Sequence, residues 1–372
     1  MLLKYSRKRI ICLVGQLGNG GTEKQLHMFL KNLPKEKYEP LVIVSSKAYI
    51  GSRREREISE GLGITLKYLH GSRPVKLIHY LYILLRFRPE TVLSWSFYAN
   101  AYCSMTPFCD FIGVIRGSLD VAREQLSPAH FAASLRPKRM IANSDFLKKQ
   151  LLDAGKVEKS VFVIPNMFEK KFSVMDKDVF TAYRNDLRKR LGISDDEIIV
   201  AGGGRNTPEK DFDLFIEVIG ELSKREECKK IKGLLVGECV HVLSPKIRDK
   251  RLEGAFYFCE ERENAHDILP AADIFFLSSK SEGMPNMLIE AIDALCLPIA
   301  TKVGGVENLL EGKHGEIILE RDARAIAGKI ADFANNPELR KEIIGTALEG
   351  IDHSLRGENI IRCFTTMFEN KP

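Results

Sequence analysis

The first half of the chain alternates short, uniformly hydrophobic runs with longer segments in which apolar residues recur every three or four positions. Runs that are apolar throughout are typical of strands covered on both faces of a parallel sheet, and the spacing of three to four indicates helices with one buried face. The alternation therefore predicts an α/β fold built on a doubly wound sheet. Strands are predicted at residues 10–15, 41–46, 91–96, 111–116, 139–144 and 161–166, and helices at 23–33, 75–87 and 144–152.

Residues 167–195 interrupt this pattern, because they are polar and leave room for only one helix, ending near Leu191 and Gly192. The pattern then restarts and predicts a second α/β domain. Since doubly wound sheets bind ligands beyond the carboxyl ends of their strands, we expect two facing Rossmann-like domains with a ligand cleft between them. In this second part, strands are predicted at 197–205, 233–238, 255–260, 273–279 and 297–305, and helices at 211–224, 265–271 and 285–295.

The length and composition agree with two domains, since 372 residues with 44% hydrophobic content can fill two cores. We assign residues 1–168 to an N-terminal domain, 169–194 to a linker, 195–352 to a C-terminal domain and 353–372 to a last helix. No apolar run reaches the ~18 residues of a membrane-spanning helix. The first apolar run leads into a glycine loop instead of a cleavage site, and the eight cysteines form no CxxC pair. We therefore expect a cytoplasmic protein with reduced thiols.

The net charge of +6 is unevenly distributed. Residues 1–88 contain 17 Lys and Arg against 6 Asp and Glu, a net +11, and the remainder carries −5. No nucleic-acid-binding motif accompanies this charge, so an anionic membrane face is the expected partner, with the protein peripheral on the inner face. The helix at 75–87 carries Tyr80, Tyr82 and Phe87, residue types that suit an interface. The alternatives are that this helix packs on the sheet and that the charges are ordinary solvated surface.

The segment SSKSEGMPNMLIEAIDA at residues 278–294 is the strongest chemical signal in the chain. Glu282 follows a predicted strand, and Glu290 lies in an otherwise apolar helix on the same face as Asn286. A buried carboxylate needs hydrogen-bond partners, and sugar hydroxyls are suitable ones. The free N–H groups at the start of this helix suit a phosphate or a developing oxyanion.

A second signal is GGGRNTPEKDF at residues 202–212, where three glycines after a strand allow close approach of a ligand. Arg205 and Lys210 are five positions apart around this turn, so they can contact one diphosphate from two sides. The alternative is a surface Arg and Lys in an ordinary turn.

The loop GQLGNGGTEKQL at residues 15–26 lacks both the GxGxxG and the P-loop pattern. Gly20 and Gly21 nevertheless place backbone N–H groups at a helix start, which favours an anion of unspecified kind. Arg116 follows a predicted strand, where either a ligand contact or a structural ion pair is expected.

Several polar residues are expected to have structural roles. Asp211 and Asp213 resemble a metal-binding DxD, but they open a helix, where acids cap N–H groups. Asn143 and Ser144 suit a helix N-cap pair, and Pro165-Asn166 a turn that leaves the first domain. The eight histidines show no metal-ligand spacing. We therefore predict no metal site.

Over nearly its whole length the chain resembles the retaining glycosyltransferases of family 4, which have the GT-B architecture of two Rossmann-like domains. The segments that carry the resemblance are GNGGTEKQL, IANSDFLKKQLLDAG with VFVIPN, GGGRNTPEKDFDLFIEVI, LLVGE, and AADIFFLSSKSEGMPNMLIEAIDALCLPIATKVGGVENLL. The EGMPNMLIEA run is similar to the family's Glu-x7-Glu signature, and it occurs together with an Arg-x4-Lys segment.

This resemblance implies a role for each candidate residue. Glu282 would contact hydroxyls of the donor sugar and Glu290 the ribose hydroxyls, while Arg205 and Lys210 would hold the diphosphate and stabilise it as it leaves. Glu282, Arg205 and Lys210 would thus be the catalytic residues, and Arg116 would contact the sugar or the acceptor. The implied donor-binding set is Gly20, Gly21, Arg205, Lys210, Glu282, Gly283, Met284, Pro285, Asn286 and Glu290.

The resemblance also implies a reaction. The enzyme would move a hexose or N-acetylhexosamine, with retention and without a metal or cofactor, from a nucleoside-diphosphate sugar to a glycan or lipid-linked acceptor in surface polysaccharide or glycolipid synthesis. We expect a UDP-sugar in preference to a GDP-sugar. The first domain would be on the acceptor side, the second would hold the donor, and the last helix would return to the first domain.

The chain departs from the family at two positions. Many members carry histidine where Arg116 stands, and Cys259 replaces a glycine near the family's base pocket.

Other functions fit the same architecture. These are a nucleotide-sugar epimerase, a sugar phosphorylase, and a non-catalytic scaffold that binds nucleotide sugars. The first two would need, respectively, a proton-abstracting pair and a cofactor lysine, for which no clear candidate is present. An NAD-dependent oxidoreductase is disfavoured by the missing GxGxxG.

Overall fold

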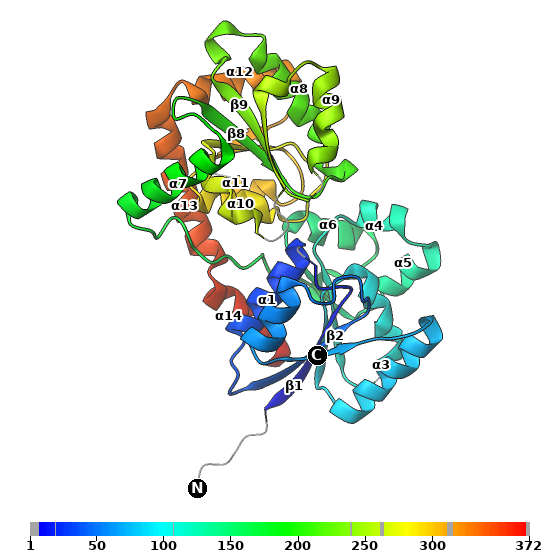
Figure 1. Ribbon diagram of the computed structural model, residues 1–372. Coiled ribbons are helices and arrows are strands. Elements are labelled where there is room, and N and C mark those ends of the chain that lie inside the picture. The colour runs from blue at the N-terminus through cyan, green and yellow to red at the C-terminus, as the bar shows by residue number, and fades with distance from the viewer. Residues whose placement is uncertain are drawn as a thin grey trace. The chain divides into compact units, whose positions relative to one another are not determined.

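A computed structural model (Figure 1) describes residues 7–18, 20–106, 108–238, 240–260, 264–310 and 315–369. The chain forms two compact units, Met1–Met167 with Leu355–Pro372, and Phe168–Ser354. The segment interpreted above as a linker therefore lies within the second unit. It contains helix α7 (Lys177–Leu191), which ends where Gly192 takes a left-handed conformation. The buried Arg188 of α7 donates hydrogen bonds to the carbonyls of Ala271, Ser194 and Glu197, which explains why this segment packs in the unit.

The first unit is built on a seven-stranded parallel sheet in the order β3-β2-β1-β4-β5-β6-β7. The sequence pattern misses β3, because this edge strand pairs only with β2 and alternates exposed with partly exposed residues. The strands are β1 (Lys8–Val14), β2 (Tyr38–Val44), β3 (Thr65–Tyr68), β4 (Thr91–Ser94), β5 (Asp110–Ile115), β6 (Arg139–Ala142) and β7 (Val161–Val163).

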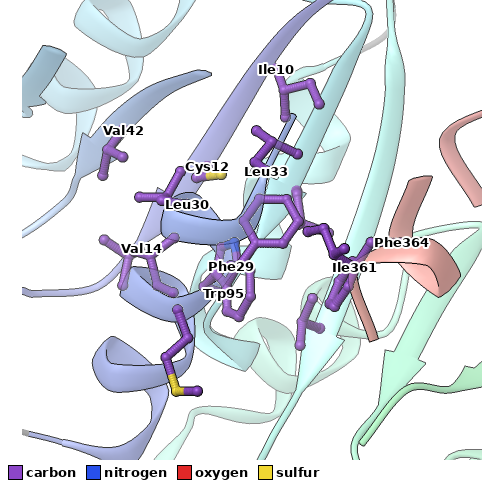
Figure 2. Close-up of a cluster of buried hydrophobic side chains, with 14 of the residues drawn as sticks. Ile10, Cys12, Val14, Phe29, Leu30, Leu33, Val42, Trp95, Ile361 and Phe364 are labelled. Atoms are coloured by element: carbon purple, nitrogen blue, oxygen red, sulfur yellow. The ribbon is translucent and has the colours of Figure 1, made fainter. Parts of the chain in front are cut away.

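Helices cover the strands of this unit, and its last helix is contributed by the end of the chain (Figure 1). The buried aromatic rings of Phe29, Trp95 and Phe364 form the centre of the core between the sheet and helices α1 and α14 (Figure 2). Ring centroids lie 5.2 Å apart for Phe29–Trp95 and 5.0 Å for Phe29–Phe364. The α-helices are α1 (Gly21–Asn32), α2 (Arg53–Arg56), α3 (Arg73–Phe87), α4 (Leu119–Gln125), α5 (Pro128–Ser134), α6 (Asp145–Asp153) and α14 (Gly357–Glu369), with a π turn at Glu57–Gly61 and 3₁₀ segments at Phe97–Met105 and Glu158–Ser160.

The second unit has a six-stranded parallel sheet in the order β10-β9-β8-β11-β12-β13. The chain runs outward from β8 to β10, then returns to β11 on the other side of β8, so the switch point lies between β8 and β11. The short edge strand β13 was not predicted. The strands are β8 (Ile198–Gly203), β9 (Ile231–Val236), β10 (Phe256–Cys259), β11 (Ile274–Leu277), β12 (Leu297–Thr301) and β13 (Glu316–Ile318).

One helix predicted for this unit is wrong. Residues 265–271 form two 3₁₀ turns, Ala265–Asp267 and Leu269–Ala271, because Pro270 has no N–H to continue an α-helix. The α-helices are α7, α8 (Phe212–Ser223), α9 (Ser244–Asp249), α10 (Asn286–Asp293), α11 (Val306–Leu310), α12 (Ala323–Ala334) and α13 (Pro337–Leu355), and the other 3₁₀ turns are Pro208–Lys210, Glu226–Cys228, Val240–Leu243 and Glu253–Ala255.

A buried carboxylate at the end of α10 anchors the start of this unit. Asp293 is fully buried and accepts hydrogen bonds from the backbone N–H groups of Lys171, Phe172 and Ser173 and from the Ser173 hydroxyl. His266 Nε2 lies 3.0 Å from its Oδ2. Burial raises the pKa of Asp293, but the hydrogen bonds from His266, Ser173 and Phe172 outweigh it, and the net pKa is lowered.

Candidate functional site

The candidate site of the second unit is formed by the two loops that leave its switch point. One loop follows β8 and carries Arg205 and Lys210, and the other follows β11 and carries Glu282 before α10 begins. Because β8 and β11 are neighbours and the loops belong to connections that diverge on either side, a crevice is expected at this edge of the sheet. This is the general ligand position in α/β sheets.

The structure brings Lys210 and Glu282 into direct contact. Lys210 Nζ donates to Glu282 Oε1 at 2.6 Å, and the Ser279 hydroxyl donates to the same oxygen at 2.7 Å. The two side chains are 23% and 12% exposed, so the pair is partly buried and reachable from solvent. Both residues were expected from the sequence to contact one ligand, but the ion pair between them was not predicted.

Arg205 lies in the same loop as Lys210, but its side chain points into solvent. Its guanidinium forms no hydrogen bond or ion pair with the parts of the chain that the structure describes. Arg205 therefore has its donors available for an anion beside Lys210, without a protein carboxylate that would compete for them.

The segment from Gly283 to Glu290 begins helix α10 as the sequence predicted, with one change. Pro285 is the residue before the helix, and Asn286 is the first helical position. Met284 is buried, and the carboxylate-bearing Glu290 is also buried, on the same helix as Asn286. The structure thus keeps Asn286 and Glu290 on one helix next to Glu282.

A residue that the sequence analysis did not select holds the Glu282 loop in place. Gly304, in the loop after β12, has φ of +53°, and a Cβ atom there would lie 1.9 Å from the carbonyl oxygen of Glu282. The next residue, Gly305, donates its N–H to the carbonyl of Gly283 at 2.6 Å. Any larger residue at Gly304 would displace the Glu282 backbone.

The glycine turn of the first unit lies before α1, with Gly20 preceding the helix and Gly21 as its first residue. The carboxylate of Glu23 folds back against Gly20, since a Cβ atom on that glycine would lie 2.3 Å from Glu23 Oε2. The carboxylate of Glu23 thus lies beside the helix start where the sequence predicts an anion. Binding of an anion there stays a prediction. Further along α1, the Gln25 amide pairs with both backbone groups of Met167, at 2.9 and 2.6 Å.

Arg116 is partly buried and belongs to a polar cluster with the buried Asn143 and Asn166, which was largely missed from the sequence. Its Nη1 donates to Asn166 Oδ1 at 2.5 Å, and its Cζ lies 4.7 Å from the centre of the Trp95 ring. Asn143 Nδ2 donates to the same Asn166 oxygen at 3.2 Å. The structural ion pair considered for Arg116 is not formed with any described residue.

Two structural assignments made from sequence are therefore corrected. Ser144 alone caps α6, where its hydroxyl accepts from Leu147 N–H at 3.3 Å, and Asn143 points to Asn166 instead. Asn166 is fixed by side-chain contacts and not only part of a turn. The signal that could have found this cluster is that Trp95, Arg116 and Asn143 each lie at the carboxyl end of a predicted strand.

Asp211 and Asp213 do not face a common site. Asp211 Oδ2 accepts from Arg321 at 2.5 Å and lies 3.5 Å from Lys280 Nζ, while Asp213 pairs with Lys246. Asp211 makes no side-chain cap to α8, so the capping role expected for it is wrong; its backbone, with φ of +47°, precedes the helix. Within the described ranges no group of three His, Cys, Asp or Glu side chains could hold a metal ion.

Near the base pocket implied by the resemblance, Cys259 ends β10, and its carbonyl accepts from Gly237 N–H at 3.1 Å. Glu260 follows and lies 2.7 Å from His241 Nδ1.

Among the described residues no helix is long and apolar enough to cross a membrane.

Part of this chain is similar to a known family of sequences. Residues 183–349 match the family described as glycosyl transferases group 1. A Bacillus subtilis (strain 168) protein, TuaC, assigned to teichuronic acid biosynthesis as a glycosyltransferase, is 31% identical over 170 residues, which are 45% of this chain and 41% of TuaC. The N-acetyl-alpha-D-glucosaminyl L-malate synthase of Bacillus anthracis is 22% identical over 208 residues, 52% of this chain and 54% of the synthase. This chain thus spans about half the length of the curated relatives it matches.

Comparison of folds covers nearly the whole chain. The Anabaena protein Alr3699/HepE, solved in complex with UDP and glucose, superimposes with a TM-score of 0.82 at 17% identity, over 97% of this chain and 99% of that one. The same protein has been solved with UDP-glucose. Residues 183–349 are thus similar to the glycosyl transferases group 1 family, and the chain as a whole shares its fold with GT-B glycosyltransferases.

Proposed function

We propose that this protein is a retaining glycosyltransferase that moves a hexose or N-acetylhexosamine from a nucleoside-diphosphate sugar to a glycan or lipid-linked acceptor. The observation that carries the proposal is the contact between Lys210 and Glu282 at the switch point of the second unit. Arg205, which pairs with no described residue, lies in the same loop. Two cations and a carboxylate at this edge match the chemistry of a diphosphate joined to a polyhydroxyl group.

In this proposal, different side chains bind different parts of the donor. Arg205 and Lys210 bind the diphosphate, and Lys210 stabilises the charge that develops on it as the bond to the sugar breaks. Glu282 accepts hydrogen bonds from sugar hydroxyls and Glu290 from the ribose. The backbone of Gly283, Met284, Pro285 and Asn286 lines the start of α10, whose N–H groups add partial positive charge. From the first unit, we propose that Gly20 and Gly21 bind an anionic group and that Arg116 contacts a substrate.

We propose that no metal or cofactor takes part. The charge-neutralising role of a metal is filled by the Lys and Arg side chains, and the side chains of Asp211 and Asp213 are already engaged in separate ion pairs. A UDP-sugar is the preferred donor in this proposal, supported by the UDP and UDP-glucose complexes of the structurally similar Anabaena protein. TuaC's place in teichuronic acid biosynthesis supports a role in surface polysaccharide or glycolipid assembly.

Helix α3 supports peripheral contact with an anionic membrane on the cytoplasmic face. Its inner face packs in the core through Tyr80, Ile83 and Leu84, while its outer face exposes apolar residues. Tyr80 therefore cannot contact a membrane, and the interfacial role expected for it is wrong. The exposed apolar side chains follow helical spacing and form what we call the α3 stripe, namely Val75, Ile78, Tyr82 and Leu85, which are 50%, 68%, 63% and 66% exposed.

Basic residues surround the α3 stripe. Arg73, Arg86 and Arg88 are exposed on the same helix and at its end. Next to the helix, a pocket of about 510 Å³ is lined by cations as well as apolar groups. An exposed apolar stripe bordered by cations is the pattern of helices that lie in the plane of an anionic membrane surface. The cations of the pocket are Arg7, Lys35, Lys67 and Arg86, with Glu39 as its one carboxylate among the described residues.

A ligand panel tests the proposed function. Purified protein is incubated with UDP-, GDP-, ADP- and dTDP-sugars, and its thermal midpoint is measured for each. A UDP-sugar should raise the midpoint most, and the matching donor should release UDP slowly to water or transfer its sugar to acceptor extracts. An epimerised nucleotide sugar or a sugar phosphate as product would favour the epimerase or the phosphorylase. Binding without any product in the presence of acceptor extracts would favour the scaffold.

A further inference from the structure

The first unit contains a partly buried cation, Arg116, whose charge no carboxylate of the described residues balances. Arg116 follows β5, and its guanidinium is held by one hydrogen bond to Asn166 and by the face of the Trp95 ring. Across the described part of the chain, no Asp or Glu pairs with it. Burial lowers the pKa of Arg116 to about 9. The pKa falls because removing the guanidinium charge from water without a compensating anion disfavours the charged form.

Two further polar atoms in the same cluster lack partners within the described chain. Arg116 Nε is buried without an acceptor, and Asn143 Oδ1 is buried without a donor. The donor and the acceptor could in principle pair, but the two atoms are not hydrogen-bonded to each other. Leaving a buried donor and a buried acceptor unsatisfied is costly, and native proteins tolerate it mainly where a ligand, ion or water completes the set.

The cluster lies where a parallel sheet binds its ligands. Trp95 follows β4, Arg116 follows β5, Asn143 follows β6, and Asn166 comes shortly after β7. These four strands are consecutive neighbours in the sheet, so their carboxyl ends meet at one edge. The aromatic packing of Trp95 against Phe29 and Phe364 makes its ring a fixed platform for the guanidinium (Figure 2).

We propose that Arg116 and Asn143 bind an anionic group of a substrate, either a carboxylate or a phosphate, that has a hydroxyl beside it. The planar guanidinium suits two oxygens of such a group, and Asn143 Oδ1 accepts from the neighbouring hydroxyl. This inference rests on the proposed function and deepens it, because it makes one of the two transferase substrates acidic. The anion belongs either to the donor sugar, as in a uronic acid, or to the acceptor.

The stability of a variant separates ligand binding from a structural role. In Arg116→Met an apolar chain of similar length replaces the unbalanced cation, so the thermal midpoint should stay equal or rise. Arg123→Met is the matched control, since Arg123 also stacks on an aromatic ring, Phe131, in the same unit, but is exposed. A midpoint several degrees lower in Arg116→Met than in Arg123→Met would show that Arg116 supports the fold and would overturn the proposal.

Binding measurements then identify the anion. Calorimetry compares UDP-glucuronate with UDP-glucose as donors, and, on UDP-saturated protein, glucuronate and glycerol 3-phosphate with glucose and glycerol as acceptor probes. Either the acidic donor or an acidic acceptor probe should bind more tightly than the neutral compound with which it is compared. Arg116→Met should weaken the binding of that acidic probe by about 10- to 100-fold, Arg116→Lys should weaken it to an intermediate extent, and Arg123→Met should leave it unchanged. Equal affinities within every pair, or no effect of Arg116→Met, overturns the anion site. Failure of UDP itself to bind would instead overturn the proposed function.

Discussion

Lys210 Nζ lies 2.6 Å from Glu282 Oε1, although the two residues are 72 positions apart in the chain. The contact joins the loop after β8 to the loop after β11, and Ser279 donates to the same carboxylate oxygen. Before a donor binds, the carboxylate thus holds the ammonium in place. A diphosphate would compete for this ammonium, while the second oxygen of Glu282 stays available for a hydroxyl.

The first prediction concerns the two cations at this edge. Lys210→Ala and Arg205→Ala should each lower turnover by about 100- to 1000-fold, because each removes a charged contact that strengthens as the leaving group gains charge. Their thermal midpoints should fall by only a few degrees, since Arg205 is exposed and the Lys210 pair is partly solvated. Initial rates with the donor found in the ligand panel provide the measurement.

The chain offers a matched control for Lys210. Lys229 Nζ also lies 2.6 Å from a glutamate oxygen, of Glu226, but the pair is exposed in the turn before β9, at the other end of the sheet. Lys229→Ala should therefore keep wild-type turnover. If Lys210→Ala and Arg205→Ala matched this control, the diphosphate site would have to lie elsewhere.

A second prediction separates the two glutamates. Glu290→Gln should weaken binding of bare UDP, because its proposed partner is the ribose. Glu282→Gln should leave UDP binding nearly unchanged and lower transfer, because its proposed partner is the sugar. Calorimetry with UDP and turnover measurements, with Glu226→Gln as control, distinguish the two. Equal losses of UDP affinity in both variants would contradict this division of roles.

A third prediction concerns metals. Activity should persist in EDTA, because Arg205 and Lys210 supply the positive charge that a divalent ion would otherwise provide. The measurement is turnover in chelated buffer with and without added manganese. Loss of activity in EDTA with recovery on manganese would make Asp211 and Asp213 candidate ligands again, despite their ion pairs with Arg321 and Lys246.

The fourth prediction tests the α3 stripe. Wild-type protein should sediment with vesicles that contain anionic lipid, more strongly as the anionic fraction rises and less strongly as salt is added. Replacing two exposed residues, Ile78→Ser with Leu85→Ser, should weaken binding at least about tenfold, since each removes a large apolar side chain from the interface. Val157→Ser with Val179→Ser is the control, because these residues are similarly exposed elsewhere.

Two results would contradict membrane docking. One is no binding of the wild type to strongly anionic vesicles at low salt, and the other is equal loss in the stripe and control variants. A soluble acceptor would then be the better hypothesis.

The fifth prediction concerns Asp293, which fixes residues 171–173 to the end of α10. Asp293→Ala should lower the free energy of unfolding by about 3–5 kcal/mol, because buried N–H donors and His266 lose their partner. The lowered pKa of this carboxyl means that its contribution is fully present above its ordinary value of 3.8 and disappears as pH falls through the lowered value.

Urea titrations at several pH values measure this effect. The difference between wild type and Asp293→Asn should be constant from about pH 7 to pH 5 and should shrink below about pH 4. A difference that instead grows as the pH falls would contradict the assignment of the lowered pKa to Asp293.

Local patterns in the sequence are sufficient to locate most helices and strands and the loops that carry candidate site residues. A buried strand such as β11 is apolar throughout, and a buried helix face repeats every three or four residues, so both can be recognised locally. Arg205, Lys210 and Glu282 could be chosen because each follows such a strand. Edge strands β3 and β13 were not predicted. They are short and only partly buried, so their pattern of apolar and polar residues resembles that of a loop.

Which of these residues contact one another depends on the packing of the whole unit. Lys210 reaches Glu282 because β11 pairs with β8, and strand order depends on how all the connections pack and not on any local pattern. The same holds for Arg116, whose partner Asn166 is 50 positions away, and for α3, where burial of Tyr80 and exposure of Tyr82 depend on which face meets the sheet. The sequence shows whether a side chain is apolar or charged, but long-range packing determines which residue it contacts.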